Sequence, residues 1–233
     1  MHIPDGFLGP QTWLASYAVM IPLWALAAKQ TKKTLKSKYI PTLAIGSAFS
    51  FAVMMFNVPI PGGSTGHAIG ATLLSLIFGP WASALIISIA LAIQALIFGD
   101  GGITSYAVNC LIMGFATSFT GYYTYMLLTK FFPNELKAKM LASGTAGYVS
   151  LVIASLLAGT VLGIQPILNP PVNGMQSYFP YSLKVSIYAM LIEHLLVFGW
   201  VESFITALSY GFLLKENSPV LNLMKEDTSL EIS

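Results

Sequence analysis

The stretch KMLASGTAGYVSLVIASLLAGTVLGI, residues 139–164, decides the class of fold, because its only charge lies at its first position. At about 1.5 Å per residue, a helix of this length crosses the roughly 30 Å hydrocarbon core of a bilayer. Of the 233 residues in the chain, 55% are hydrophobic and 9% are charged, whereas soluble domains carry roughly 25% charged residues. The sequence therefore predicts an all-α integral membrane protein.

Similar apolar segments recur along the chain and predict about seven transmembrane helices in one bundle. We expect helices over residues 12–28, 40–56, 67–79, 81–98, 105–129, 139–164 and 183–213. The third and fourth segments are separated at Gly79-Pro80, because proline removes a helix donor. One transmembrane, substrate-binding domain then covers residues 1–217, and a polar cytoplasmic tail covers residues 218–233.

The placement of lysine predicts the orientation, because cytoplasmic loops collect Lys and Arg. Lysines cluster between the first and second segments, between the fifth and sixth, and after the seventh. Seven crossings place all three clusters on one side of the membrane, with only Lys184 on the other. We therefore expect a bacterial cell (inner) membrane protein with its N-terminus outside and its C-terminus in the cytoplasm.

Several classes of function are disfavoured by what the sequence lacks. No basic stripe of the kind that binds nucleic acid is present. Cys110 is the single cysteine, which excludes an internal disulfide and a site built from several thiolates. The phosphate-binding pattern G-x-x-x-x-G-K-[ST] is also absent. We expect neither an enzyme nor an organic cofactor, and any uptake driven by ATP requires partner subunits.

The N-terminal pair Met1-His2 offers three nitrogen donors to one metal ion. The free Met1 amine and the His2 amide nitrogen close a five-membered chelate ring, and the amide and the imidazole Nδ1 close a six-membered one. A second imidazole completes a square plane, which suits Ni(II) or Cu(II). His67 follows the glycine-rich stretch PIPGGSTG, residues 59–66, and is the natural fourth ligand. We therefore predict a metal site at Met1, His2 and His67.

Other polar residues are candidates to support the metal ligands, because a ligating imidazole usually donates its second N–H to a carboxylate or carbonyl. Ionisable residues inside a membrane segment, such as Glu193 and His194, are also functional candidates by default. For each, a role in structuring a loop is an equal alternative. The supporting candidates are Asp5, Ser64, Thr65, Asp100, Asn109 and His194.

Three stretches resemble the NikM/CbiM family: MHIPDGFLGP at residues 1–10, PIPGGSTGHAIGATL at residues 59–73 and GDGGITSYAVNCLIMG at residues 99–114. Members are the substrate-specific S components of energy-coupling-factor (ECF) transporters for Ni²⁺ and Co²⁺. The resemblance implies a seven-helix bundle with an inserted N-terminal segment, and a metal bound by Met1, His2 and His67. It also implies a coupling transmembrane subunit, ATP-binding subunits and a small accessory membrane protein as partners. The pair Pro4-Asp5 is more typical of the nickel branch.

Two other functions compete with capture of Ni²⁺ or Co²⁺ as a transported substrate. Residues 62–66 match G-x-S-x-G, and Asp100 and His194 follow in the order of a hydrolase triad. An intramembrane serine hydrolase using Ser64 and His194 is therefore one alternative, although that motif requires a strand–turn–helix in a parallel sheet. The other alternative is an autonomous metal-ion transporter that uses the ionisable residues inside the last apolar segment.

Overall fold

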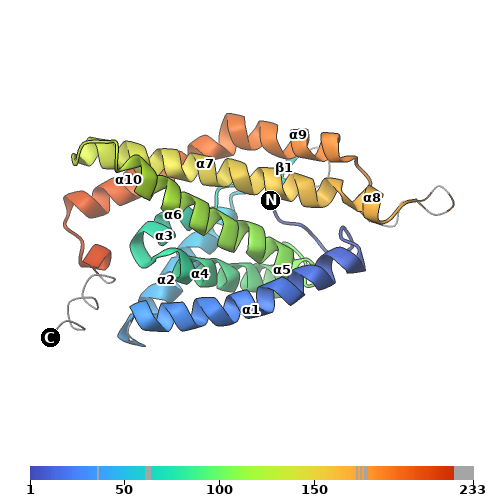
Figure 1. Cartoon of the computed structure of the whole chain (residues 1–233), viewed down its shortest axis with the longest axis horizontal. Helices are drawn as coiled ribbons and strands as arrows, with labels where there is room; N and C mark the ends of the chain where they lie inside the picture. The colour runs from blue at the N-terminus through green and yellow to red at the C-terminus, as the bar shows by residue number, and fades with distance from the viewer. Residues whose placement is uncertain (36, 61–63, 172, 174, 176–177, 223–233) are drawn as a thin grey trace.

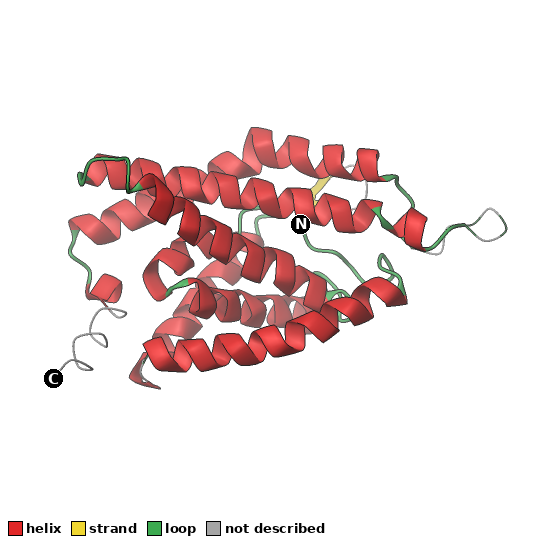
Figure 2. Ribbon diagram, viewed as in Figure 1, coloured by secondary structure: helices red, strands yellow, loops and turns green. Residues whose placement is uncertain are grey.

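Helices make up most of the chain in the computed structural model, which describes residues 1–35, 37–60, 64–171, 173, 175 and 178–222 (Figures 1 and 2). The α-helices are α1 (Pro10–Thr34), α2 (Ile40–Met54), α3 (Ala71–Phe78), α4 (Pro80–Ile93), α5 (Tyr106–Asn109), α6 (Thr117–Leu128), α7 (Leu136–Gly163), α8 (Gln165–Leu168), α9 (Leu183–Glu193) and α10 (Gly199–Lys215). The 3₁₀-helices are η1 (Ser37–Tyr39) and η5 (Pro219–Asn222). Three π-helical turns are η2 (Gln94–Phe98), η3 (Cys110–Ala116) and η4 (His194–Phe198).

The predicted all-α membrane fold is confirmed, and each of the seven expected segments contains helix. Within the described residues, three continuous helical runs are long and apolar enough to cross a membrane: Pro80–Phe98, Leu136–Leu168 and Leu183–Lys215. The expected break between the third and fourth segments is also present. Gly79 adopts a φ of +80° between α3 and α4, a conformation that glycine adopts without steric cost.

Small residues let α7 pack closely against α9 and α10 along one side of the bundle (Figure 1). A Cβ added at Gly159 would lie 2.9 Å from the Cα of Ile187 in α9, and one added at Gly147 would lie 3.0 Å from Thr206 Oγ1 in α10. Close approach at small residues is the usual way in which membrane helices associate. The helices α7, α9 and α10 therefore form one packed layer.

The N-terminal segment, residues 1–9, runs into the bundle between this layer and α1 (Figure 1). Met1, Ile3 and Leu8 are buried, and the carbonyl of Phe7 accepts a hydrogen bond from the amide of Phe179 at 3.0 Å. The inserted N-terminal segment implied by the family resemblance is thus confirmed.

Two short strands form in the segment that follows α2, where the sequence indicated only a glycine-rich stretch. Strand β1 (Val58–Ile60) pairs antiparallel with β2 (Ser64–Gly66), with Val58 opposite Gly66. Both strands pack against α9. Because His67 follows β2 directly, the hairpin determines where this imidazole enters the bundle.

Candidate metal centre

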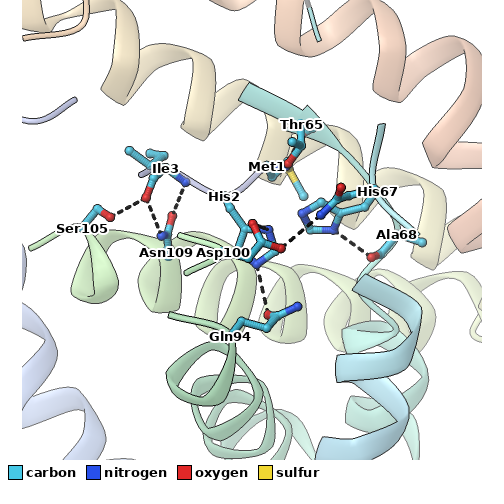
Figure 3. Close-up of polar contacts among 11 residues, drawn as sticks. Met1, His2, Ile3, Thr65, His67, Ala68, Gln94, Asp100, Ser105 and Asn109 are labelled. Atoms are coloured by element: carbon cyan, nitrogen blue, oxygen red, sulfur yellow. Dashed lines mark hydrogen bonds and ion pairs between the residues drawn. The ribbon is translucent and has the colours of Figure 1, made fainter. Parts of the chain in front are cut away.

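The side chain of His2 is buried where the N-terminal segment meets the turn η2 (Figure 3). Its Nε2 lies 3.1 Å from Oε1 of Gln94. A carbonyl oxygen only accepts, so Nε2 carries the proton and Nδ1 carries the lone pair. Burial is the main cause that lowers the pKa of His2 to about 3, so the ring is neutral at physiological pH. Nδ1 is the nitrogen that a metal would use, and it lies 3.4 Å from Oδ1 of Asp100.

His67 is fully buried and presents its lone pair in a similar way. Its Nδ1 donates to the carbonyl of Ala68 at 2.9 Å, so Nε2 is the nitrogen with the lone pair. Nε2 is buried and has no hydrogen-bond partner among the described residues. A buried polar atom without a partner is costly, unless a ligand such as a metal ion occupies the position in front of it.

The two imidazoles lie side by side, with ring centres 4.6 Å apart and ring planes at 27°. Two imidazoles bound at adjacent corners of one metal ion, at about 2 Å, would have ring centres roughly 4.4 Å apart. The spacing of His2 and His67 therefore fits two neighbouring positions around a single ion.

The main-chain amine of Met1 completes the cluster (Figure 3). It donates to the carbonyl of Thr65 and, at 3.1 Å, to the Thr65 hydroxyl. Burial lowers the pKa of this amine to about 4, and the nearby carboxylates of Asp100 and Glu193 oppose that shift only in part. The amine is therefore neutral at physiological pH, which is the form that binds metals.

Asn109 anchors this arrangement through Ile3, the residue after His2 (Figure 3). Asn109 Oδ1 accepts from the Ile3 amide at 3.0 Å, and Asn109 Nδ2 donates to the Ile3 carbonyl at 3.0 Å. The Ser105 hydroxyl donates to the same carbonyl. Both polar groups of the buried Ile3 main chain are thereby satisfied, and the direction of His2 is fixed.

Asp5 lies farther out and structures a loop instead of contacting the imidazoles. Its carboxylate accepts from the amides of Ile103 and Thr104, at 3.0 and 2.8 Å, and from the Thr104 hydroxyl. Although partial burial raises the pKa of Asp5, these hydrogen bonds hold it below its usual value. The side chain ties the N-terminal segment to residues 99–104.

The remaining candidates fall in different places. Asp100 lies beside His2 and also accepts from Asn57 Nδ2 at 3.1 Å. His194 is buried in η4, where its Nδ1 contacts the Met190 carbonyl at 2.7 Å, and its Nε2 has no hydrogen-bond partner among the described residues. The side chain of Ser64 lies outside the part of the chain that the structure describes.

The serine hydrolase alternative receives no support from this geometry. The nucleophile turn of a hydrolase connects a strand of a parallel sheet to a helix. Here Ser64 begins β2, which pairs antiparallel with β1 in a two-stranded sheet.

Gln94 is the residue that sequence reasoning missed. It is fully buried and contacts His2 directly, yet it is a single amide in an otherwise apolar stretch, residues 80–98. Its only sequence signal is that isolation, since a polar side chain within an apolar membrane helix requires a buried partner.

The available donors are nitrogens from two imidazoles and from the main chain. Among the described residues, no three His, Cys, Asp or Glu side chains cluster closely enough to hold a metal ion. A nitrogen-rich set of this kind suits later transition metals and not hard cations such as Mg²⁺ or Ca²⁺.

The fold and the site define an α-helical membrane protein with a buried cluster of nitrogen donors that is suited to a transition metal. A family model described as the cobalt uptake substrate-specific transmembrane region, CbiM, matches residues 2–220, and the chain belongs to this family.

Two similar proteins are named as metal transport proteins. The chain is 43% identical over 215 residues to the probable fused nickel transport protein LarMN of Lactiplantibacillus plantarum, covering 91% of this chain and 64% of that protein. It is 40% identical over 230 residues to the putative metal transport protein MJ1569 of Methanocaldococcus jannaschii, covering 98% of each.

A solved structure titled as a truncated transition metal transporter has the same fold. It superposes with a TM-score of 0.88 at 48% identity and covers 93% of this chain and 99% of that chain. The chain is thus a membrane protein of a cobalt and nickel transport family.

We expect Gly102→Ala to weaken Ni²⁺ binding by at least tenfold, about the size of effect seen when a group supporting a ligand is lost. An added Cβ at Gly102 would collide with the main-chain nitrogen and the carboxylate of Asp5, and would push the N-terminal segment out of place. Titration calorimetry on the purified protein measures the change.

The matched control is Gly46→Ala in α2, where the atoms nearest to the added Cβ are methyl groups of Leu74 and Ile86, at 3.2 and 3.4 Å. That variant should bind Ni²⁺ as the unmodified chain does. Unchanged affinity in Gly102→Ala would show that close docking of the N-terminal segment on residues 99–104 is not needed for the site.

Proposed function

We propose that this protein captures Ni²⁺, with Co²⁺ as a second substrate, as the S component of an ECF importer. The observation that carries the proposal is that Met1, His2 and His67 are all buried and that the two imidazole ring centres lie 4.6 Å apart. The ion is cargo, so the site has to bind it selectively and later release it.

The proposed coordination is a plane of four nitrogens. The Met1 amine, the ionised His2 amide and His2 Nδ1 form two fused chelate rings, and His67 Nε2 occupies the fourth corner. Binding then releases a proton from the His2 amide. The amine and the His2 ring already have their lone pairs available, because burial lowers the pKa of both groups, and His67 Nδ1 carries the proton, which leaves the Nε2 lone pair available.

Two neighbouring side chains tune this site. Gln94 fixes the tautomer of His2 by accepting from Nε2, which directs the Nδ1 lone pair toward the metal. Asp100 supplies negative charge beside His2. An ionised amide leaves one positive charge on a divalent ion, and the Asp100 carboxylate offsets it. Outer groups of this kind commonly change metal affinity by about 10- to 100-fold.

The donor set favours nickel over harder ions, and copper is its natural competitor. Cu(II) binds nitrogen sites at least as tightly as Ni(II) by the usual affinity order. Discrimination against copper therefore depends on which metal is available outside the cell. The relative named for nickel transport and the family model described for cobalt uptake support both ions as cargo.

We further propose that the N-terminus faces the outside of a bacterial inner membrane and that the C-terminus is cytoplasmic. Seven crossings would place the lysine clusters on the side opposite the N-terminus, and cytoplasmic loops collect such residues. Without a phosphate-binding loop of its own, the chain relies on ATP-binding subunits, a coupling transmembrane subunit and a small accessory membrane protein. The fused relative, of which this chain spans 64%, has room for one such additional part.

We expect one Ni²⁺ per chain, with binding weakened at least 100-fold by His2→Ala, by His67→Ala or by one additional residue ahead of Met1. The first two changes remove an imidazole. The third keeps every side chain but moves the amine out of the chelate. Titration calorimetry measures affinity, and intact-mass measurement establishes that the wild-type amine is free and that Met1 is retained.

Lys184→Ala is the control, since this exposed lysine at the start of α9 lies outside the site. Full Ni²⁺ binding by the extended chain would mean that the amine is not a ligand.

We also expect Gln94→Leu to weaken Ni²⁺ binding by about 10- to 100-fold, because His2 Nε2 loses its acceptor and the tautomer is no longer fixed. Gln94→Glu retains an acceptor oxygen and should bind within about tenfold of the wild type. Competition titrations against a chelator compare the two variants. Equal losses in both would contradict the assigned role of Gln94.

A further inference from the structure

Glu202 is a carboxylate buried in the middle of the last membrane-spanning run, on α10, with no exposed surface. Its partners are main-chain amides. Oε2 accepts from Ile69 at 2.8 Å and from Gly70 at 2.9 Å, and Oε1 lies 3.2 Å from the Gly70 nitrogen. Burying a carboxylate costs free energy unless hydrogen bonds compensate it. The hydrogen bonds from Ile69 and Gly70 supply that compensation for Glu202.

This contact lies at the beginning of α3, which follows Gly70 directly. The first amides of a helix lack intrahelical partners and carry partial positive charge. The residue that would normally supply a capping side chain is Gly70, which has none and adopts a φ of +76°. Glu202 brings a carboxylate to this end of α3 from a different helix and accepts from the amides of Gly70, which directly precedes α3, and of Ile69.

The same two amides belong to the segment that carries His67. Only Ala68 separates His67 from Ile69, and the Ala68 carbonyl accepts from His67 Nδ1 at 2.9 Å. The carbonyl of Ile69 accepts in turn from the Ser50 hydroxyl of α2 at 2.7 Å. The position of this short stretch therefore sets the direction of the His67 ring and of its buried Nε2.

We propose that Glu202 is a positioning residue for metal capture, holding the His67 imidazole in place by fixing the main chain of Ile69 and Gly70 to α10. This inference rests on the proposed role of His67 as a ligand. The carboxylate is not proposed as a metal ligand. It acts on His67 only through the main chain of residues 68–70.

The two imidazoles of the site are therefore held in place by different helical elements. His2 and Ile3 are attached to η2 and α5, through Gln94 and Asn109. His67 is attached to α10, through Glu202. A displacement of α10 relative to η2 would separate the imidazoles and remove one donor while the Met1-His2 chelate stays intact. The Glu202 contact thus connects the position of a membrane-spanning helix to the strength of metal binding.

A double-mutant cycle with Cu²⁺ as the probe tests this inference. Cu²⁺ is used because the Met1-His2 chelate alone binds it tightly enough to be measured without His67. We expect Glu202→Gln to weaken Cu²⁺ binding at least tenfold, and to shift the visible absorption band toward that of His67→Ala. In the His67→Ala background, the same change should alter the dissociation constant by less than about twofold, because residues that act through one another are not additive.

The outcomes separate this inference from the proposed function. If His67→Ala itself leaves the affinity and the absorption band of the wild type unchanged, His67 is not a ligand and the proposed function fails. If His67→Ala weakens binding but Glu202→Gln has no effect, or an equal effect in both backgrounds, only the role of Glu202 is overturned.

Two further variants complete the experiment. Glu216→Gln, which changes an exposed carboxylate just after α10, is the control and should leave the Cu²⁺ affinity unchanged. Glu202→Asp provides a second cycle if Glu202→Gln yields no folded protein. It keeps the charge but is one methylene too short to hold both amides, so the same non-additive pattern is expected, and equal losses in both backgrounds overturn the inference.

Discussion

The reciprocal pairing of Asn109 with the main chain of Ile3 is the constraint on which the rest of the site depends. A bilayer interior offers no water to unpaired main-chain groups, so a buried, non-helical N-terminus requires side chains that supply both a donor and an acceptor. One amide side chain does so, at 3.0 Å for each bond. With Ile3 fixed, His2 and the Met1 amine are held beside His67.

Three π-helical turns interrupt the helices in the part of the chain that the structure describes. Turn η2 begins at Gln94, η3 begins directly after Asn109, and η4 begins at His194. A π-helical turn changes the direction in which side chains point and is frequently found at functional sites. Gln94 and Asn109, whose side chains bind the N-terminal segment, thus lie at or next to points where their helices depart from regular α geometry.

Sequence reasoning predicted the helices, which the structure confirms, and it proposed Met1, His2 and His67 as metal ligands, because both have local signals. Apolar length predicts a membrane helix, and the chelate of Met1-His2 follows from covalent connectivity. Gln94 and Glu202 were not assigned a role, because their partners are a distant imidazole and distant main-chain amides that no spacing reveals. Of the two roles that the sequence allowed for Asp5, its contacts match the structuring of a loop, since its carboxylate accepts from the amides of Ile103 and Thr104.

X-ray absorption spectroscopy of the Ni²⁺-loaded protein tests the central claim most directly, because it reports the number, type and geometry of the donor atoms. The chelate of Met1 and His2 completed by His67 predicts a planar shell of four nitrogens that contains two imidazoles. A six-coordinate shell rich in oxygen, or a shell with a single imidazole, would contradict it.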